Sequence, residues 1–422
     1  MRLITAAVKK LPVVTVLIAV DAGSSNDPLG KEGIASLTAA LLAEGTEQYD
    51  GAELAEKFEE LGTSVETGAD WDSAFLKITT LSQNLQPALA LLGQVITQPQ
   101  FAEREIERLK AERLAEILQL ETEPRGLADE KFSEFVYADQ SRYSQPDEGS
   151  ESSVKALTRK DVKEFYHSNY TSSVSTVLLA GDITAHASRR VVSDVLKNLR
   201  KGHVNHSPVT TNPRSRTRRI QLVHKIDAPQ SELRVGHVGL PRLHPDFFPT
   251  LVMNAILGGL FGSRINLNLR EVHGYTYGAS SYYDWRRGAG PFVVSTAVQS
   301  DVTQAAIREI LLEIDRIRAE LVSDAELSLA KDYLDGVFPI RYETTSAIAS
   351  ALANRVIYGL PADYYDSYRE NIRRVTSSDV LRAAQSHIHP EQLQIVVVGD
   401  AKALTGPLAE LEFGPLQVHD GR

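Results

Sequence analysis

Cysteine is absent from the 422 residues of this chain, and its absence removes three classes of chemistry. Disulfide bonds, thiolate zinc sites and thiol nucleophiles all require it. Long apolar runs are also missing, since no stretch approaches the roughly 18 residues that cross a bilayer. The chain lacks an excess of basic residues too, because 45 Lys and Arg stand against 55 Asp and Glu, a formal net charge of −10. This charge counts against binding to nucleic acids or to anionic membranes.

The apolar segment at residues 13–20 imitates the core of a signal peptide, because Lys9 and Lys10 precede it. However, Asp21 follows directly, and no clear Ala-x-Ala cleavage site comes after it. β-branched residues dominate the segment, which is typical of a buried strand that ends in a turn. We therefore prefer a strand to a signal peptide at residues 13–20.

An internal duplication organises the chain. The run Val-Leu-Leu-Ala-Gly-Asp that ends at Asp182 is echoed by Ile-Val-Val-Val-Gly-Asp, which ends at Asp400. About twenty residues ahead of each run, Thr158 and Thr376 stand three residues before an aspartate, a pattern that caps the start of a helix. Both pairs are 218 positions apart (400 − 182 and 376 − 158), which is about half of the chain. Two echoes at the same spacing predict two similar halves.

The two halves run through the same order of elements and are separated by a polar, aperiodic stretch. We predict an N-terminal half at residues 1–200, a linker at 201–218 and a C-terminal half at 219–422. The predicted fold class is α+β, with a mixed β-sheet in each half and helices packed on one face. The predicted elements are strands at 13–20, 73–80, 232–238 and 292–298, and helices at 33–43, 103–120, 250–258 and 303–320.

Residues 33–46, Gly-Ile-Ala-Ser-Leu-Thr-Ala-Ala-Leu-Leu-Ala-Glu-Gly-Thr, carry a resemblance to a known family. They are similar to the Gly-Leu-Ala-His-x-x-Glu-His-x-x-x-x-Gly-Thr helix of the insulinase/pitrilysin-type (inverted zincin) metallopeptidases, and the similarity extends over essentially the whole chain. In that helix the two His bind zinc and the Glu activates the bound water. Here these positions hold Ser36, Ala39 and Ala40, and the family's third ligand maps onto Glu116. Alanine has no ligand atom and a serine hydroxyl is a poor one, so we expect no metal in this chain and a solvated Glu116.

A second family segment lies in the C-terminal half. Residues 269–277, Leu-Arg-Glu-Val-His-Gly-Tyr-Thr-Tyr, are similar to the family's Leu-Arg-Glu-x-x-Gly-x-x-Tyr segment. The resemblance implies that Arg270 binds a carbonyl of the substrate backbone and that Tyr277 donates a hydrogen bond to the scissile carbonyl oxygen. Both roles are physically reasonable, because arginine presents fixed donors and a phenol can stabilise an oxyanion. The simpler alternative is a surface ion pair for Arg270 and core packing for Tyr277.

The zinc motif is therefore lost while the Arg and Tyr pair is present, although a decaying enzyme would lose both. We interpret the chain as the non-zinc-binding subunit of a heterodimeric zinc metallopeptidase. The resemblance implies a homologous H-x-x-E-H partner that holds the zinc, with a peptide or unfolded polypeptide as substrate. The family's mitochondrial non-catalytic subunit has a long glycine-rich loop, whereas the loop at residues 257–264 is short, which favours the bacterial type.

Two other functions stay open. The chain resembles the core subunits of respiratory complexes, family members that assemble without proteolysis, or it captures peptides without cutting them. A homodimer of the isolated chain is compatible with each function, and a bacterial periplasm or cytoplasm fits equally well. The family's first strand and its Leu-Pro-Asn-Gly lead-in are not found ahead of residue 13, so we expect the natural chain to begin earlier.

Trp71 and Asp72 lead into the predicted strand at residues 73–80. In the zinc-bearing members the corresponding edge strand pairs with the substrate backbone, so the resemblance implies that both residues could line the substrate chamber. Packing of Trp71 under the sheet explains it equally well.

Two close histidine pairs remain, His203 with His206 and His387 with His389. No acidic third ligand is evident near either pair in the sequence. We therefore interpret all four as surface histidines rather than as a metal site.

Overall fold

The computed structural model describes residues 1–195, 197–204 and 206–421, and these residues form two compact units. Unit 1 consists of Met1–Ile117, Pro146–Pro208 and Pro339–Tyr364, and unit 2 consists of Leu118–Gln145, Val209–Phe338 and Tyr365–Arg422. Each unit contains one mixed β-sheet, so the predicted α+β fold with two similar halves is confirmed. Each unit also contains a segment from the other half of the sequence.

The sheet of unit 1 has 5 strands in the order β1-β5-β2-β4-β3. Only β1 and β5 run parallel, and the other neighbours are antiparallel. The predicted strand at residues 13–20 is β2, and it is buried in the middle of the sheet. One expectation is wrong, because a strand does precede residue 13 and pairs with β5. The bounds are β1 Arg2–Ala7, β2 Val13–Val20, β3 Glu66–Ala69, β4 Ala74–Leu81 and β5 Ser175–Gly181.

The sheet of unit 2 has 6 strands in the order β11-β6-β10-β7-β9-β8. Apart from the added edge strand β11, its order and its parallel and antiparallel pairings repeat those of unit 1, which is the structural form of the duplication. The bounds are β6 Arg219–His224, β7 Gln230–Val238, β8 Ala279–Tyr283, β9 Pro291–Gln299, β10 Gln394–Gly399 and β11 Leu416–Asp420.

Most helices of each unit cover one face of its sheet. In unit 1 these are α1 (Ile34–Leu41), α2 (Gly51–Glu59), α3 (Leu85–Thr97), α4 (Glu103–Thr122), α7 (Arg159–Asn169) and α8 (Ala185–Val195), while the short α6 (Glu151–Ala156) lines a cavity with α1 and α4. In unit 2 they are α9 (Phe247–Asn254), α10 (Arg264–Asn266), α11 (Thr303–Ala319), α12 (Asp324–Arg341), α14 (Tyr364–Arg374), α15 (Ser377–His387) and α16 (Ala401–Ala409). Two π-helical segments, η5 (Ala255–Gly259) and η6 (Leu267–Val272), flank α10.

The predicted helix caps of the duplicated segments are confirmed. The Thr158 side chain accepts a hydrogen bond from the Asp161 N–H at the start of α7, and Thr376 accepts one from Asp379 at the start of α15. In both cases the aspartate answers by accepting from the threonine N–H, so two otherwise unpaired donors are satisfied at each helix start.

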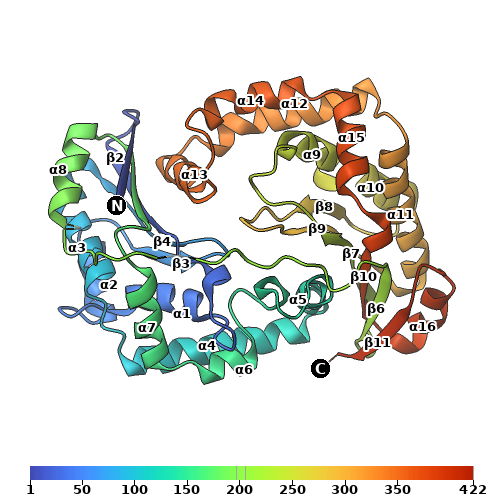
Figure 1. Ribbon diagram of the computed structural model, residues 1–422, viewed down its shortest axis with the longest axis horizontal. Coiled ribbons are helices and arrows are strands. Elements are labelled where there is room, and N and C mark those ends of the chain that lie inside the picture. The colour runs from blue at the N-terminus through green and yellow to red at the C-terminus, as the bar shows by residue number, and fades with distance from the viewer. Residues whose placement is uncertain (196, 205, 422) are drawn as a thin grey trace. The chain divides into compact units, whose positions relative to one another are not determined.

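The opposite face of each sheet is covered by a helix from the other half of the chain. In unit 1 this helix is α13 (Thr345–Ile357), whose Ala349 and Ala353 pack on Leu17 and Leu178 of the sheet. In unit 2 it is α5 (Pro124–Val136), which contacts β7 and β10 and lies across the sheet from α11 and α16 (Figure 1). Both faces of the central strands β2, β5, β7 and β10 are therefore covered.

The stretch Phe247–Val272, which spans α9 to η6, is long and apolar enough to cross a membrane by composition alone. Half of its most apolar window is buried inside the protein. Val252, Leu257 and Ile265 from this stretch belong to the core of unit 2. Its apolar character is therefore accounted for by packing against the sheet.

Candidate functional site

The three zinc-motif positions lie on α1 in unit 1. Ser36 and Ala39 are buried and Ala40 is half-buried. Ser36 and Ala40 line a cavity of about 80 Å³ together with Arg113 and Glu116 from α4. The helix face that would hold two histidines therefore does face the carboxylate of the expected third ligand.

Arg113 places a positive charge beside the carboxylates of this cavity. The Nη1 atom of Arg113 lies 3.1 Å from Glu116 Oε2 and also contacts the carboxylate of Glu148. The Glu116 side chain is 60% exposed, in keeping with a solvated helix residue. With Ala39 and Ala40 offering no ligand atom, and with the remaining carboxylates held by a guanidinium, these residues do not fit a zinc ion.

Rebuilding the motif should show that Arg113 is a second obstacle to zinc. We expect the Ser36→His, Ala39→Glu, Ala40→His triple variant to bind zinc poorly, because a fixed positive charge remains beside the carboxylate of Glu116. Adding Arg113→Ala should tighten zinc binding at least about tenfold, or about 1.4 kcal/mol. The measurement is calorimetric titration, after subtraction of any zinc binding by the chain with its natural sequence. Arg104→Ala, on an exposed side chain of the same helix, is the control. Equal affinities with and without Arg113 would contradict this explanation.

Arg270 and Tyr277 lie together in unit 2 and line an open cavity of about 620 Å³. The guanidinium carbon of Arg270 is 4.7 Å from the ring centre of Phe261 and 5.1 Å from that of Tyr277. These cation–π contacts hold the arginine between two aromatic rings. The Tyr277 side chain is 91% exposed, so the alternative that it packs in the core is wrong. The alternative of a surface ion pair for Arg270 is met in part, since its Nε lies 3.2 Å from Glu271 Oε1.

A π-helical segment and close backbone contacts hold Arg270 and Tyr277 in position. Arg270 belongs to the π-helical segment η6, a geometry that often occurs at functional sites. The buried Asn266 donates to the Phe261 carbonyl at 2.6 Å and accepts from the Ala279 N–H at 3.0 Å, which ties the loop before α10 to strand β8. Gly258 is needed beside this strand, because a Cβ there would lie 2.4 Å from Ser281 Oγ.

Two charged residues in the same cavity are not found by the sequence analysis. Arg125 comes from the start of α5, and Glu232 comes from β7. Arg125 is 145 positions before Arg270 (270 − 125) and follows no family segment, so no spacing signal could have revealed it. With Arg125 and Arg270, the cavity presents two guanidinium groups, which suit carbonyl and carboxylate oxygens.

Trp71 and Asp72 lie in unit 1, in the turn between β3 and β4. Asp70 Oδ1 accepts hydrogen bonds from the N–H groups of Asp72 and Ser73, which fixes the turn. Asp72 is buried and Trp71 is half-buried. The structure therefore places both residues in a different unit from the cavity of Arg270 and Tyr277.

The prediction that all four paired histidines are surface residues is wrong for His387. His387 is not a surface residue, because its side chain is only 11% exposed and its Nε2 lies 2.7 Å from Asp246 Oδ2. His206 contacts the backbone carbonyl of Asp21 at 2.7 Å. The acidic neighbour of His387 escapes a sequence reading because it is 141 positions away (387 − 246).

Comparisons with known proteins match this architecture along nearly the whole chain. The model of the insulinase family, peptidase family M16, matches residues 2–145, and the model of the peptidase M16 inactive domain matches residues 156–334. A protein of Helicobacter pylori named non-peptidase homolog YmxG is 22% identical over 93% of this chain and 90% of its own length. A probable mitochondrial-processing peptidase subunit beta of Arabidopsis thaliana is 24% identical over 92% of this chain and 75% of its own length.

A solved structure described as a peptidase M16 inactive domain from Pseudomonas fluorescens superposes with a TM-score of 0.89 at 25% identity, covering 94% of this chain and 95% of that one. The matched residues include the degenerate zinc helix in the first family model and the Arg270 segment in the second. The two models together match residues in both halves and include both segments that carry the resemblance. This chain belongs to the insulinase family of peptidases, family M16.

Proposed function

We propose that this chain is the non-zinc-binding subunit of a heterodimeric zinc metallopeptidase, in which Arg270 and Tyr277 bind the substrate peptide and stabilise the scissile carbonyl. The observation that carries the proposal is the contrast between two sites. Unit 1 has lost the zinc ligands and holds Arg113 among its carboxylates, whereas Arg270 and Tyr277 of unit 2 line an open cavity. Tyr277 is 91% exposed, so a large aromatic ring faces water in the isolated chain. A bound partner or peptide would cover this apolar surface.

The names of the relatives support a non-catalytic chain and a divided enzyme. One relative is called a non-peptidase homolog, and another is called a subunit of a processing peptidase. The partner we propose is a homologous subunit with an intact H-x-x-E-H motif. Zinc held by that partner would supply the activated water, while this chain supplies no ligand to that catalytic zinc.

The chemistry of the two side chains fits the division of labour. The Arg270 guanidinium is already oriented by the rings of Phe261 and Tyr277, so little side-chain entropy is lost when it donates to a peptide carbonyl. The phenol of Tyr277 reaches solvent and can donate to an oxygen that gains negative charge. Neither group can cut a peptide bond without a nucleophile, so the isolated chain should be inactive.

The test is hydrolysis of an internally quenched peptide by this chain, by an H-x-x-E-H homologue encoded beside its gene, and by their equimolar mixture, all with zinc present. We expect only the mixture to cut. Arg270→Ala should lower kcat/KM of the mixture by about 10- to 150-fold, because a hydrogen bond to a charged group contributes about 1.5–3 kcal/mol. Arg308→Ala, which changes an exposed arginine on α11, is the matched control.

Other results would support the alternatives. Hydrolysis by this chain alone would mean that it holds a metal and a nucleophile elsewhere. A partner that cuts at full rate alone would favour a structural role like that of respiratory-complex core subunits. Binding of the peptide by this chain with no gain in hydrolysis, and with no loss on Tyr277→Phe, would favour a peptide-binding module.

A further inference from the structure

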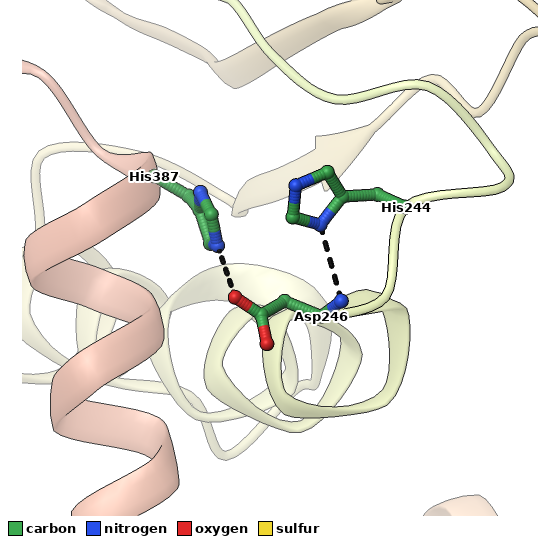
Figure 2. A group of neighbouring side chains, drawn as sticks. All are labelled: His244, Asp246 and His387. Carbon is green, nitrogen blue, oxygen red and sulfur yellow. Dashed lines mark hydrogen bonds and ion pairs between the residues drawn. The ribbon is translucent and has the colours of Figure 1, made fainter.

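Three side chains with metal-binding atoms meet in unit 2, away from the cavity of Arg270 and Tyr277. They are His244, Asp246 and His387, and one ligand atom from each lies within 4.8 Å of the others. Figure 2 shows the imidazoles of His387 and His244 side by side above the start of α9, with the Asp246 carboxylate beneath His387. The ring centres of His244 and His387 are 4.9 Å apart and the rings are nearly perpendicular.

Three separate elements hold this cluster in place. His244 lies in the loop after β7, Asp246 is the N-cap residue of α9, and His387 is the last residue of α15. Asp246 does not cap its own helix with its side chain, so the carboxylate is directed instead to His387, with Oδ2 2.7 Å from His387 Nε2. His244 Nδ1 accepts a hydrogen bond from the Asp246 N–H at 3.1 Å, so the lone pair of the neutral ring is on Nδ1, the atom that a metal ion would take over from this N–H. The Asp246 carboxylate thus contacts the imidazole of His387 and lies within 4.8 Å of a ring nitrogen of His244, and carboxylate and imidazole are both common metal ligands.

We propose that His244, Asp246 and His387 form a binding site for a divalent transition-metal ion such as Zn²⁺, separate from the family's catalytic metal position. Two imidazoles and one carboxylate are a common ligand set for first-row transition metals, and imidazole suits zinc in particular. All three residues are half-buried, so water can complete the coordination. The bound ion would join the loop after β7 and the start of α9 to the end of α15.

The protonation states favour ligation. The Arg382 guanidinium, and after it His387, lower the pKa of the Asp246 carboxyl to about 2, so the carboxylate is ionised at neutral pH. Burial, and after it the neighbouring His387, lower the pKa of His244, which leaves its imidazole neutral. These are the forms in which both groups bind metals.

Arg382 is the competitor for this site. Its Nη1 lies 2.8 Å from Asp246 Oδ2, the same oxygen that contacts His387. The Arg382 side chain is 49% exposed and has a second acidic neighbour, Asp379, at 3.7 Å, so it can leave Asp246 without losing all of its partners. The proposal therefore makes an unusual prediction, that removal of Arg382 strengthens metal binding. A purely structural ion pair would show no such gain.

The test is calorimetric titration of the metal-free full chain with zinc chloride, together with the visible absorption spectrum of the Co²⁺ form. We expect one saturable zinc site per chain. His387→Ala and Asp246→Asn should each weaken it at least about tenfold, since even partners that only support a ligand are worth that much. His389→Ala removes a half-buried imidazole two residues away that is not part of the cluster, and it should leave the affinity unchanged. Arg382→Gln should tighten the affinity and keep the Co²⁺ spectrum.

Several results would overturn the site. These are no saturable binding by the unchanged chain, equal binding by His387→Ala, or a loss in His389→Ala as large as that in His387→Ala. If His387→Ala fails to fold, Arg382→Gln decides, because all three ligands are intact and an affinity that is unchanged or weaker contradicts the proposal. None of these readouts uses peptide hydrolysis, so the outcome is independent of the proposed peptidase role.

Discussion

Replacing Tyr277 by phenylalanine should lower kcat of the mixture with the zinc-bearing partner by about 10²- to 10³-fold and leave KM nearly unchanged. The phenol would donate to the carbonyl oxygen most strongly when that oxygen carries negative charge, so its loss affects the transition state more than the bound substrate. The ring remains, so the cation–π contact with Arg270 at 5.1 Å is retained. The measurement is steady-state hydrolysis of the quenched peptide with this chain in excess over its partner.

The matched control is Tyr333→Phe, which removes the hydroxyl of another exposed tyrosine in the same unit, on α12. It should leave both kinetic constants unchanged. Size-exclusion chromatography should show that both variants assemble like the unchanged chain. A rise in KM at constant kcat would mean that Tyr277 only binds the substrate, and no change in either constant would remove it from the reaction.

Local signals predicted much of the fold. Residues 13–20 form β2 as expected, because a run of β-branched residues bounded by turns has few other stable conformations. The capping pairs of Thr158 and Thr376 also form, since a cap depends on residues only three positions apart. The duplication predicted two similar halves, and the two sheets do repeat one strand order.

The exchanged helices α5 and α13 could not be predicted in the same way. An amphipathic pattern shows that a helix has an apolar face, but it does not show which sheet covers that face. Nothing near Phe132 or Asp129 in the sequence indicates that α5 packs on the C-terminal sheet, where Phe132 closes against Gly236 of β7. A short-range pattern can therefore identify a helix. The sheet on which that helix packs is set by contacts between residues more than a hundred positions apart in the sequence.

The same limit separates the predicted and missed parts of the site. Arg270 and Tyr277 stand seven positions apart in one segment, and the structure brings them into contact with one cavity. Arg125 joins them only because α5 belongs to unit 2. His387 and Asp246 meet because α15 packs on α9. The sequence around His387 contains no signal for this contact.

Arg234 on β7 should be the most sensitive buried charge in unit 2. Its side chain is almost fully buried and binds the carboxylates of Asp129 on α5 at 2.5 Å and Glu232 on β7 at 2.9 Å. It also donates to the backbone carbonyl of Arg125 at 3.3 Å. We expect Arg234→Met to destabilise unit 2 by roughly 3 kcal/mol, because the largely buried Glu232 carboxylate loses its partner while the volume is nearly kept.

The chain's two tryptophans make this measurable, since Trp71 lies in unit 1 and Trp285 in unit 2. In a Trp71→Phe background, urea unfolding followed by Trp285 fluorescence reports on unit 2 alone. Asp129→Asn is the control and should cost at most about 1 kcal/mol, because the Asp129 side chain is half-exposed and the buried Arg234 keeps Glu232 as its charged partner.

Adding Glu232→Gln to Arg234→Met should recover part of the lost stability, because the unpaired buried charge is then gone. Further destabilisation by Glu232→Gln in that background would show that Arg234 acts through packing and not through charge. The ion pair fastens α5 to β7, and α5 carries Arg125 into the cavity of Arg270. Arg234→Met should therefore also weaken peptide binding by the mixture with the zinc-bearing partner. This effect is expected without urea, where unit 2 remains folded.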